Sequence, residues 1–429
     1  MKKAAFTICA KNYIGLALVL EKSIKKFNSD IEFFIFVADE IHKEDNILDL
    51  PKNVIVAKDV VGIEPQTWNQ MSFKYDLTEF CTSIKPSCFK YIFEKHNPDS
   101  CIYFDPDILV YNSLDCIYDN LVENSIMVTP HITTIETKYT GKLNERSLFY
   151  SGMFNLGFLG LKNDDSAKRM LDWWEIRLED RCFQNMMENY FTDQKWMDFL
   201  PSFFSKELLI SSNLGLNVAP WNFYEREIIY ECDEYLVKNR INTSEKNTFP
   251  LTFIHFSGFN YKFLIDDKVT QANIKDLEIY SDYKQPIDIY IEYLKESDFL
   301  KYSKLKYSYG SFSNGIQISV IYRKLFRRLF EDGKIDSDPF ESSNVFYQQL
   351  KKNKILKENM VVNDKVSVNN YDNVERKTIL INKMLNYFFK IIGANRFFLL
   401  TRLMRLYSKT ENHVYLIDKS YFKNFKIRN

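Results

Sequence analysis

The stretch CIYFDPDILVYNSL, residues 101–114, contains the most informative feature of the chain. Residues 101–104 have the composition of a short buried strand, and such a strand normally stops at a turn residue rather than at paired acids. Here the strand is followed by Asp105 and Asp107, one on each side of Pro106. Pro106 favours extended geometry at the residue before it. Residues two apart on an extended backbone point to the same side, so the two carboxylates are predicted to converge.

The spacing of Asp105 and Asp107 has two explanations. Two convergent carboxylates repel each other unless a cation or protons lie between them, and a divalent metal ion is the simplest solution. The alternative is a surface turn with two solvated acids, which the triplet alone supports about equally well. Other parts of the chain have to decide between these two interpretations.

The composition restricts the class of protein. With 429 residues, 45% of them hydrophobic and 16% aromatic, the chain is long enough for two domains with substantial cores. Lys+Arg and Asp+Glu number 57 each, so no net charge attracts the protein to nucleic acid. The seven cysteines are scattered without C-x-x-C spacing. That pattern favours reduced thiols in a cytoplasm and argues against a zinc site or a disulfide framework.

Strands and helices alternate along the first hundred residues. Strands are predicted at 4–9, 31–40, 53–60 and 101–104, and helices at 14–26 and 83–95. Lys11 and Asn12 interrupt the first apolar run, so it is interpreted as a strand and a helix rather than a signal peptide. The alternation predicts an α/β fold with a mostly parallel sheet, in which ligands bind outside the carboxyl ends of strands. Asp105 and Asp107 lie at such an end.

The composition divides the chain into four predicted parts. They are a domain at 1–262, a mixed helical extension at 263–350, a polar linker at 351–376 and a helical segment at 377–429. Within the last part, 381–409 mixes apolar residues with spaced lysines and arginines, and Gly393 makes two short helices as plausible as one. Such a segment either packs its apolar side on the rest of the protein or lies as a basic amphipathic helix on a membrane surface. No apolar run reaches the eighteen residues typical of a membrane span.

Six short segments occur in the order found in one group of enzymes. They are AKNY, SIKPSCFKYIF, YFDPDILV, FNLGFLGL, TDQKW and FIHFSG. In this order they resemble bacterial nucleotide-sugar glycosyltransferases of the GT-A fold, most nearly the group that includes glycogenin and lipopolysaccharide galactosyltransferases. The resemblance covers residues 1 to about 260. It implies an α/β, Rossmann-like, mostly parallel mixed sheet flanked by helices, with a helical C-terminal region added.

The resemblance also implies a third metal ligand. In the family, the two acids and a distant histidine hold a manganese ion that bridges the donor diphosphate, which implies a site made by Asp105, Asp107 and His255. Oxygen ligands suit Mg²⁺ or Mn²⁺, and one imidazole favours Mn²⁺. A single histidine after an apolar run is otherwise more often a hydrogen-bonded core residue.

Other positions match residues that contact the nucleotide in the family. Lys85 matches a basic residue that faces the donor phosphates, and Asn12 and Tyr13 match contacts to the nucleoside. Each has an ordinary alternative: a solvated lysine at a helix start, a loop asparagine and a packed tyrosine. The resemblance favours a UDP-sugar as the donor. Where the family often has an acid that grips uracil, however, this chain has Ala10, so the identity of the base stays open.

The sugar end of the predicted donor site comes from three later segments. Asn155 and Gly157 would run beneath the donor sugar, where glycine permits close backbone approach, although a core strand with a bulge is the alternative. Asp193 and Gln194 match the family's Asp-Gln pair beside the anomeric carbon and are the predicted catalytic residues. Asp193 could instead cap a helix. Finally, the segment APWNF offers an aromatic platform and an amide for a sugar, or simply a core tryptophan.

The sequence therefore predicts a metal-dependent, retaining hexosyltransferase. Its partners would be a nucleotide-sugar donor and a cell-surface glycan acceptor, as in lipopolysaccharide, capsule or glycoprotein, or a lipid-linked glycan, in the cytoplasm at the inner face of the membrane. One alternative is a sugar-1-phosphate nucleotidyltransferase, which normally carries an N-terminal Gly-rich, basic loop that this sequence lacks. The other is a noncatalytic glycan-binding protein, against which the intact Asp105, Asp107 and His255 argue.

Overall fold

Two structural units share the chain, and neither of them is one continuous segment. The computed structural model describes residues 1–45, 47, 50–244, 247–274, 276–335, 338–356 and 373–422. The first unit comprises Met1–Pro65 and Leu77–Ser308, and the second comprises Gln66–Asp76 and Tyr309–Asn429. The predicted boundaries at 262, 350 and 376 stay predictions, and most of the predicted linker at 351–376 lies outside the described residues.

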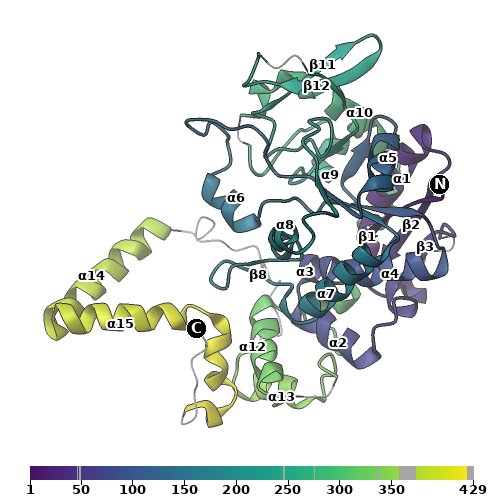
Figure 1. The fold of residues 1–429 in the computed structure, drawn as a ribbon. Coiled ribbons are helices and arrows are strands. Elements are labelled where there is room, and N and C mark those ends of the chain that lie inside the picture. The colour runs from purple at the N-terminus through teal and green to yellow at the C-terminus, as the bar shows by residue number, and fades with distance from the viewer. Residues whose placement is uncertain are drawn as a thin grey trace. The chain divides into compact units, whose positions relative to one another are not determined.

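A seven-stranded sheet forms the centre of the first unit (Figure 1). Its strands, in spatial order, are β10 (Leu208–Ile210), β6 (Ile126–Val128), β7 (Phe158–Lys162), β4 (Ser100–Phe104), β1 (Lys3–Cys9), β2 (Glu32–Val37) and β3 (Val54–Val56). The pairs β1–β2, β1–β4, β2–β3 and β6–β10 are parallel, whereas β7 runs antiparallel to both of its neighbours. The predicted α/β class with a mostly parallel, mixed sheet is confirmed.

Helices cover both faces of this sheet because alternate strand residues point to opposite sides. Helices α1 (Ile14–Phe27) and α5 (Asp115–Glu123) pack on one face, where Ala5 and Cys9 of β1 join their core. On the other face the ring of Phe6 lies 4.7 Å from that of Phe89 in α4 (Lys85–Lys95). Helix α7 (Asp165–Arg181) packs against α4 and begins at Asp164, whose side chain accepts a hydrogen bond from Ala167 N.

Smaller elements complete the first unit. Two strands, β5 (Ile108–Val110) and β14 (Phe253–His255), form an antiparallel pair, and β11 (Arg226–Glu231), β12 (Glu234–Asn239) and β13 (Phe249–Pro250) form a three-stranded sheet. A two-stranded hairpin joins β8 (Gln184–Asn185) to β9 (Tyr190–Phe191). The helices are α3 (Leu77–Ser83), α6 (Glu145–Ser151), α8 (Leu200–Phe203), α9 (Tyr261–Ile265), α10 (Lys284–Lys295) and α11 (Phe299–Tyr302).

The second unit is helical and is built around a segment from the first fifth of the chain. That segment is α2 (Pro65–Lys74), and its partners are α12 (Val320–Glu331) and α13 (Val345–Lys352). The ring of Phe73 is fully buried, 4.7 Å from that of Phe326. The guanidinium of Arg323 donates to the carbonyls of Ser72, Phe73 and Tyr75 around the C-terminal end of α2. The helical C-terminal region is thereby confirmed.

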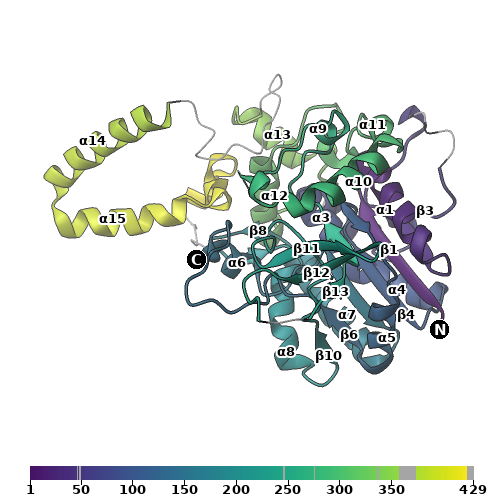
Figure 2. The same cartoon turned by 90° about the horizontal axis from the view of Figure 1, so that it is seen from above.

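The remaining helices of the second unit follow the residues that the structure leaves undescribed. They are α14 (Val374–Ile392) and α15 (Ala394–Tyr407), followed by the 3-10 helices η9 (Thr410–Leu416) and η10 (Lys419–Phe422) (Figure 2). Val414 of η9 is buried in the same core as α12. None of the seven cysteines, all of which lie in the described part of the chain, forms a disulfide bond.

Candidate metal and donor site

The two carboxylates of the opening motif lie in a turn between two strands. Strand β4 ends at Phe104, and the backbone N–H of Ile108 donates to the carbonyl of Asp105 at 3.2 Å, with Pro106 between them. Proline is favoured at this position of a β-turn. The expected extended geometry from Asp105 to Asp107 is therefore wrong. The chain reverses there, and the turn rather than strand alternation brings the carboxylates together.

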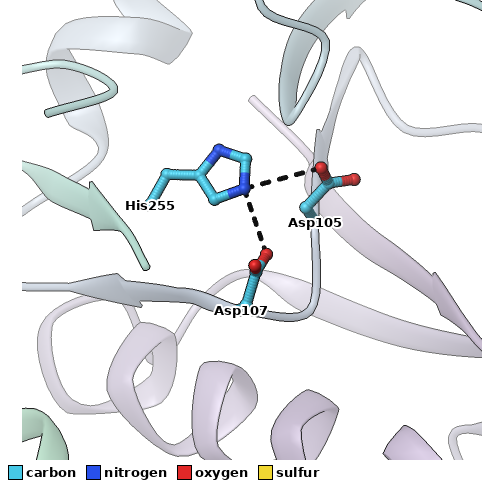
Figure 3. A group of neighbouring side chains, drawn as sticks. All are labelled: Asp105, Asp107 and His255. Carbon is cyan, nitrogen blue, oxygen red and sulfur yellow. Dashed lines mark ion pairs between the residues drawn. The ribbon is translucent and has the colours of Figure 1, made fainter. Parts of the chain in front are cut away.

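The pairing of β14 with β5 brings His255 to these carboxylates. His255 lies opposite Ile108, the residue after Asp107. Its Nε2 is 3.1 Å from Oδ1 of Asp107 and 3.7 Å from Oδ2 of Asp105, as Figure 3 shows. One ligand atom from each residue lies within 4.8 Å of the other two. The structure thus gathers all three predicted metal ligands at one point.

Two tyrosines orient the carboxylates toward His255. The hydroxyl of Tyr103 donates to Oδ1 of Asp105 at 2.5 Å, and that of Tyr261 donates to Oδ2 of Asp107 at 2.8 Å. Burial raises the pKa of both tyrosines well above its usual value, and the neighbouring aspartates add to the increase. Both hydroxyls therefore stay protonated. Each carboxylate binds a tyrosine with one oxygen and turns the other oxygen toward the imidazole.

The far side of the His255 ring contacts Asn155. Nδ1 of His255 lies 3.3 Å from Oδ1 of Asn155, and this oxygen also accepts hydrogen bonds from Gly157 N and Asn217 Nδ2, both at 3.1 Å. A backbone N–H can only donate, so the Asn155 atom is the oxygen and Nδ1 of His255 carries a proton toward it. In the neutral ring, Nε2 is then the nitrogen with a lone pair, and it faces the two carboxylates.

Gly157 leaves the space that the imidazole occupies. A Cβ atom on Gly157 would lie 2.4 Å from Cε1 and 2.5 Å from Nδ1 of His255, well inside contact distance. The carbonyl of Gly157 also accepts a hydrogen bond from the backbone N–H of Asp105 at 2.8 Å. The glycine predicted a group close to the backbone at this position. That group is the His255 ring, and the approach of a donor sugar stays a prediction.

The protonation of the group is set by opposing effects. Burial disfavours the imidazolium of His255, but the charge and hydrogen bond of Asp107, with the charge of Asp105, outweigh it and raise the pKa of His255. Burial likewise opposes ionisation of Asp107, and the charge of His255 reverses this, so the pKa of Asp107 is lowered. Both shifts favour an imidazolium–carboxylate pair when no metal ion is bound, and a metal ion at this point would take the place of the proton on Nε2.

Lys85 is buried between two acids at the start of α4. Its Nζ is 2.7 Å from Oδ2 of Asp193 and 3.8 Å from Oδ1 of Asp105, and it donates to the carbonyl of Leu156 at 2.8 Å. The ammonium also lies 4.2 Å from the centre of the Tyr103 ring. The alternative of a solvated lysine is therefore wrong. Lys85 links the Asp105 turn to the segment that carries Asp193.

Asp193 and Gln194 lie at the start of the 3-10 helix η4 (Gln194–Phe199). Asp193 makes no side-chain cap, contrary to the capping alternative; burial raises its pKa although Lys85 opposes the shift. The amide of Gln194 is held by backbone groups, accepting from Leu156 N at 3.3 Å and donating to the carbonyl of Ser151 at 2.7 Å.

The residue before this pair adopts a strained conformation. Thr192 has a φ of +45°, which a β-branched residue rarely adopts, and its hydroxyl donates to Oδ1 of Asp193 at 3.1 Å. The surrounding structure therefore fixes the direction of the Asp193 side chain.

Asn12 and Tyr13 occupy the 3-10 helix η1 (Lys11–Tyr13), directly after β1. The ring of Tyr13 is partly exposed and meets that of Tyr261 edge to face, with the centroids 6.3 Å apart. Tyr261 in turn binds Asp107, so Tyr13 is one aromatic ring away from the carboxylates. Oδ1 of Asn12 is buried and accepts no hydrogen bond from any of the residues that the structure describes.

The two candidate residues of the segment APWNF, Trp221 and Asn222, differ in their contacts. Trp221 is nearly buried and packs its ring against those of His255 and His131, 5.3 Å and 5.4 Å between centroids. Asn222 is fully buried, and its amide bonds to the backbone of Ala219, His131 and Asn217. The expected amide for a sugar is therefore wrong for Asn222, because its polar atoms are already used inside the protein.

Three contributors to the site were missed by sequence reasoning. Tyr103 stands within the segment YFDPDILV and Tyr261 three residues after the segment FIHFSG, so their closeness in sequence to the acids and the histidine was the available signal. Asn217 binds Asn155 and has no comparable signal, because its role depends on a contact between distant parts of the chain.

The chain is similar to an uncharacterized protein and to solved structures of glycosyltransferases. No protein-family model matches the chain. The uncharacterized protein YfnF of Bacillus subtilis (strain 168) is 25% identical over 265 residues, which are 60% of this chain and 82% of that protein. Among solved structures, the galactosyltransferase LgtC in complex with donor and acceptor sugar analogs is similar over 68% of this chain and 96% of its own, with 16% identity and a TM-score of 0.38. The glycosyltransferase GlyE of Streptococcus pneumoniae TIGR4 is similar over 73% of this chain and 67% of its own, with 15% identity and a TM-score of 0.36.

Proposed function

We propose that this protein is a metal-dependent glycosyltransferase that moves a hexose from a nucleotide diphosphate sugar to a glycan acceptor. One observation carries the proposal: Asp105, Asp107 and His255 converge within 4.8 Å outside the carboxyl end of β4. Ligands of mostly parallel α/β sheets bind at such ends. The buried cation of Lys85 beside Asp105 adds positive charge at the same edge, as an anionic diphosphate requires.

The residues fit a divalent ion. They supply carboxylate oxygens and one imidazole nitrogen, a donor set that suits Mn²⁺ better than Ca²⁺ and also accepts Mg²⁺. Each ligand is already oriented by another group: Asp105 by Tyr103, Asp107 by Tyr261 and His255 by Asn155. Such supporting contacts are typical of metal sites. A bound ion would supply charge stabilisation to the diphosphate as the glycosidic C–O bond breaks.

Other residues take proposed roles from their positions around the ligands. Tyr13 and Asn12 lie beyond Tyr261 and are placed to meet the nucleoside, with the buried Oδ1 of Asn12 offering an acceptor. Lys85 would share its charge between Asp193 and the donor phosphates. Asn155 and Gly157 would border the sugar.

Retention of anomeric configuration is the proposed stereochemical outcome. It rests on Asp193 and Gln194 as the catalytic residues, since Asp193 lies beside Lys85 near the carboxylates and the family resemblance implies retention. The anomeric proton signal of the product, measured by NMR, tests it, and an inverted product would refute it.

The proposed location of the reaction is the cytoplasm, at the inner face of the cell membrane. There a nucleotide-sugar donor, for which UDP is the favoured carrier, and a glycan or lipid-linked glycan acceptor would both be available. The neighbour LgtC was solved with donor and acceptor sugar analogs, which is the same kind of substrate pair.

One assay separates the proposal from its two alternatives. The purified protein is incubated with a panel of nucleotide sugars in Mn²⁺ and then in excess chelator, and the released nucleotide is measured. A glycosyltransferase releases nucleoside diphosphate in a metal-dependent manner. A sugar-1-phosphate nucleotidyltransferase instead consumes nucleoside triphosphate, and a glycan-binding protein does neither, so either of these results would contradict the proposal.

A further inference from the structure

Helices α14 and α15 expose their whole surface. They contain 19 and 14 residues, and none of these residues is buried. Gly393, with a φ of +76°, joins the two helices, which follow one another around a sharp bend (Figure 2). The rings of Phe389 and Phe397 meet across this joint, with their centroids 5.4 Å apart. The two helices suggested by Gly393 in the sequence are therefore present. Within the described part of the second unit, no side chain of either helix belongs to the buried core around α12.

The exposed surface of these helices is unusually apolar. Large hydrophobic side chains recur at helical spacing along α14, and α15 continues the pattern. The most exposed are Tyr387 and Leu399, at 68% each. The exposed set comprises Ile379, Leu380, Ile381, Met384, Tyr387, Phe388, Phe389 and Ile391 of α14 with Phe398, Leu399, Leu403, Met404 and Tyr407 of α15. Exposed apolar patches of this extent mark surfaces that bind a membrane or another protein.

The charged residues of the same helices are almost all basic. Arg376, Lys383 and Lys390 follow one another at intervals of seven, so they form one stripe along α14 beside the apolar face. Lys377 and the arginines of α15, at 396, 402 and 405, add to the positive charge, while Glu375 is the one acidic side chain between 374 and 407. A face of apolar side chains flanked by lysine and arginine is the composition of helices that lie in the headgroup region of anionic bilayers.

We propose that α14 and α15 lie together in the plane of an anionic lipid surface. No helix in the described part of the chain is long and apolar enough to cross a membrane, which leaves the interface as the place where these helices meet lipid. The charge argues against a second copy of this chain as the partner. Two such faces would bring their basic stripes together, whereas an anionic lipid surface attracts them.

The attachment of the pair to the second unit decides how it can be tested. After α15 the chain continues into η9, where Val414 is buried in the core and Oε1 of Glu411 lies 3.6 Å from Arg327 in α12. A truncation before α14 would remove these core residues as well. Substitutions of exposed side chains in the full chain leave that core intact.

The test is cosedimentation of the full chain with phosphatidylcholine vesicles that contain or lack phosphatidylglycerol. A basic variant carries Lys383→Gln, Lys390→Gln and Arg402→Gln, and an apolar variant carries Ile381→Ser, Met384→Ser and Phe388→Ser. Each basic side chain near an anionic surface adds about fivefold in affinity, so the basic variant should bind about 100-fold more weakly. The apolar variant should lose at least tenfold, and raising the salt should weaken the wild type.

The controls carry matched substitutions at exposed sites elsewhere. One contains Ile176→Ser and Ile321→Ser, and the other contains Lys168→Gln and Lys206→Gln; both should bind like the wild type. No donor or acceptor is present, so the result does not depend on the proposed transfer activity. Three results would overturn the proposal. The wild type does not bind anionic vesicles, or both helix variants bind them as tightly as the wild type does. The third is that light scattering shows dimers that the apolar variant abolishes, without any vesicle binding.

Discussion

Asn155 holds His255 from the side opposite the two carboxylates, with 3.3 Å between Oδ1 of Asn155 and Nδ1 of His255. This contact selects the ring nitrogen that faces Asp105 and Asp107. Because such supporting contacts typically change metal affinity 10- to 100-fold, Asn155→Leu should weaken Mn²⁺ binding by about that factor. Asn155→Asp keeps an acceptor for the ring N–H and should lose less. Calorimetric titration with Mn²⁺ measures both, and equal binding by both variants and the wild type would contradict the assignment.

Removal of Asp107 should abolish the proposed activity without unfolding the protein. Asp107→Ala takes away one ligand, so turnover should fall by about three orders of magnitude or more while the melting temperature stays close to that of the wild type. Nucleotide release from the active donor, with and without chelator, is the measurement. Asp119→Ala, which changes an exposed aspartate of α5, serves as the control. An unchanged rate in the Asp107 variant would refute a metal role.

A single methyl group at Gly157 should displace the histidine. In Gly157→Ala the new Cβ would lie 2.4 Å from the His255 ring, so the ring must move, and the rate should fall by about 10- to 100-fold. Gly160→Ala, three residues later in β7, is the matched control, since its Cβ would meet the end of the Leu121 side chain at 3.1 Å, which can give way. Equal rates for the two variants would contradict the close contact between Gly157 and the His255 ring.

The buried ion pair of Lys85 and Asp193 makes a prediction about stability. Lys85→Met leaves a buried carboxylate without its cation, which should cost about 3–5 kcal/mol of unfolding free energy. Adding Asp193→Asn should restore part of the loss, because the unpaired charge disappears. Lys22→Met breaks an exposed pair with Glu296 and should cost at most about 1 kcal/mol. Urea unfolding checks all three, and additive losses in the double variant would refute the pairing.

His131 should make the stability depend on pH. Burial lowers its pKa to about 4, against about 6.5 in an unfolded chain. A group whose pKa is lowered on folding binds more protons when unfolded, so its contribution of about 3 kcal/mol is complete above pH 6.5 and is lost as the pH falls toward 4. The gap in unfolding free energy between wild type and His131→Gln should therefore be larger at pH 7 than at pH 4.5. Urea unfolding of both proteins at the two pH values is the measurement, and an equal gap at both would contradict the prediction.

Local patterns predicted the elements well where neighbours in sequence decide them. The predicted strand at 4–9 and helix at 14–26 agree with β1 and α1 to within one residue, because apolar spacing and end residues are local signals. The predicted strand at 53–60 stops at Val56, since that residue pairs with Val37, the last residue of β2, and no partner strand continues beyond it. The length of an edge strand depends on its partner, which sequence spacing does not reveal.

The candidate site likewise combines residues that the sequence could predict with contacts that it could not. The three ligands could be named from motifs and a family resemblance, and the structure brings them together. The contact between Asn155 and His255 could not be predicted, because it requires β14 to pair with β5 in one particular register. The burial of Asn222 is likewise set by contacts between distant segments, whereas the turn at Asp105 has a local signal in Pro106.

The place of α2 in the second unit affects how the chain is synthesised. Trp68 and Phe73 leave the ribosome early, but the aromatic residues that surround them in the folded protein, such as Tyr309 and Phe326, are made much later. Synthesis runs from the N-terminus, and domains generally fold as complete units. The nascent chain must therefore carry α2 without its partners from α12 and α13 until those helices have been made.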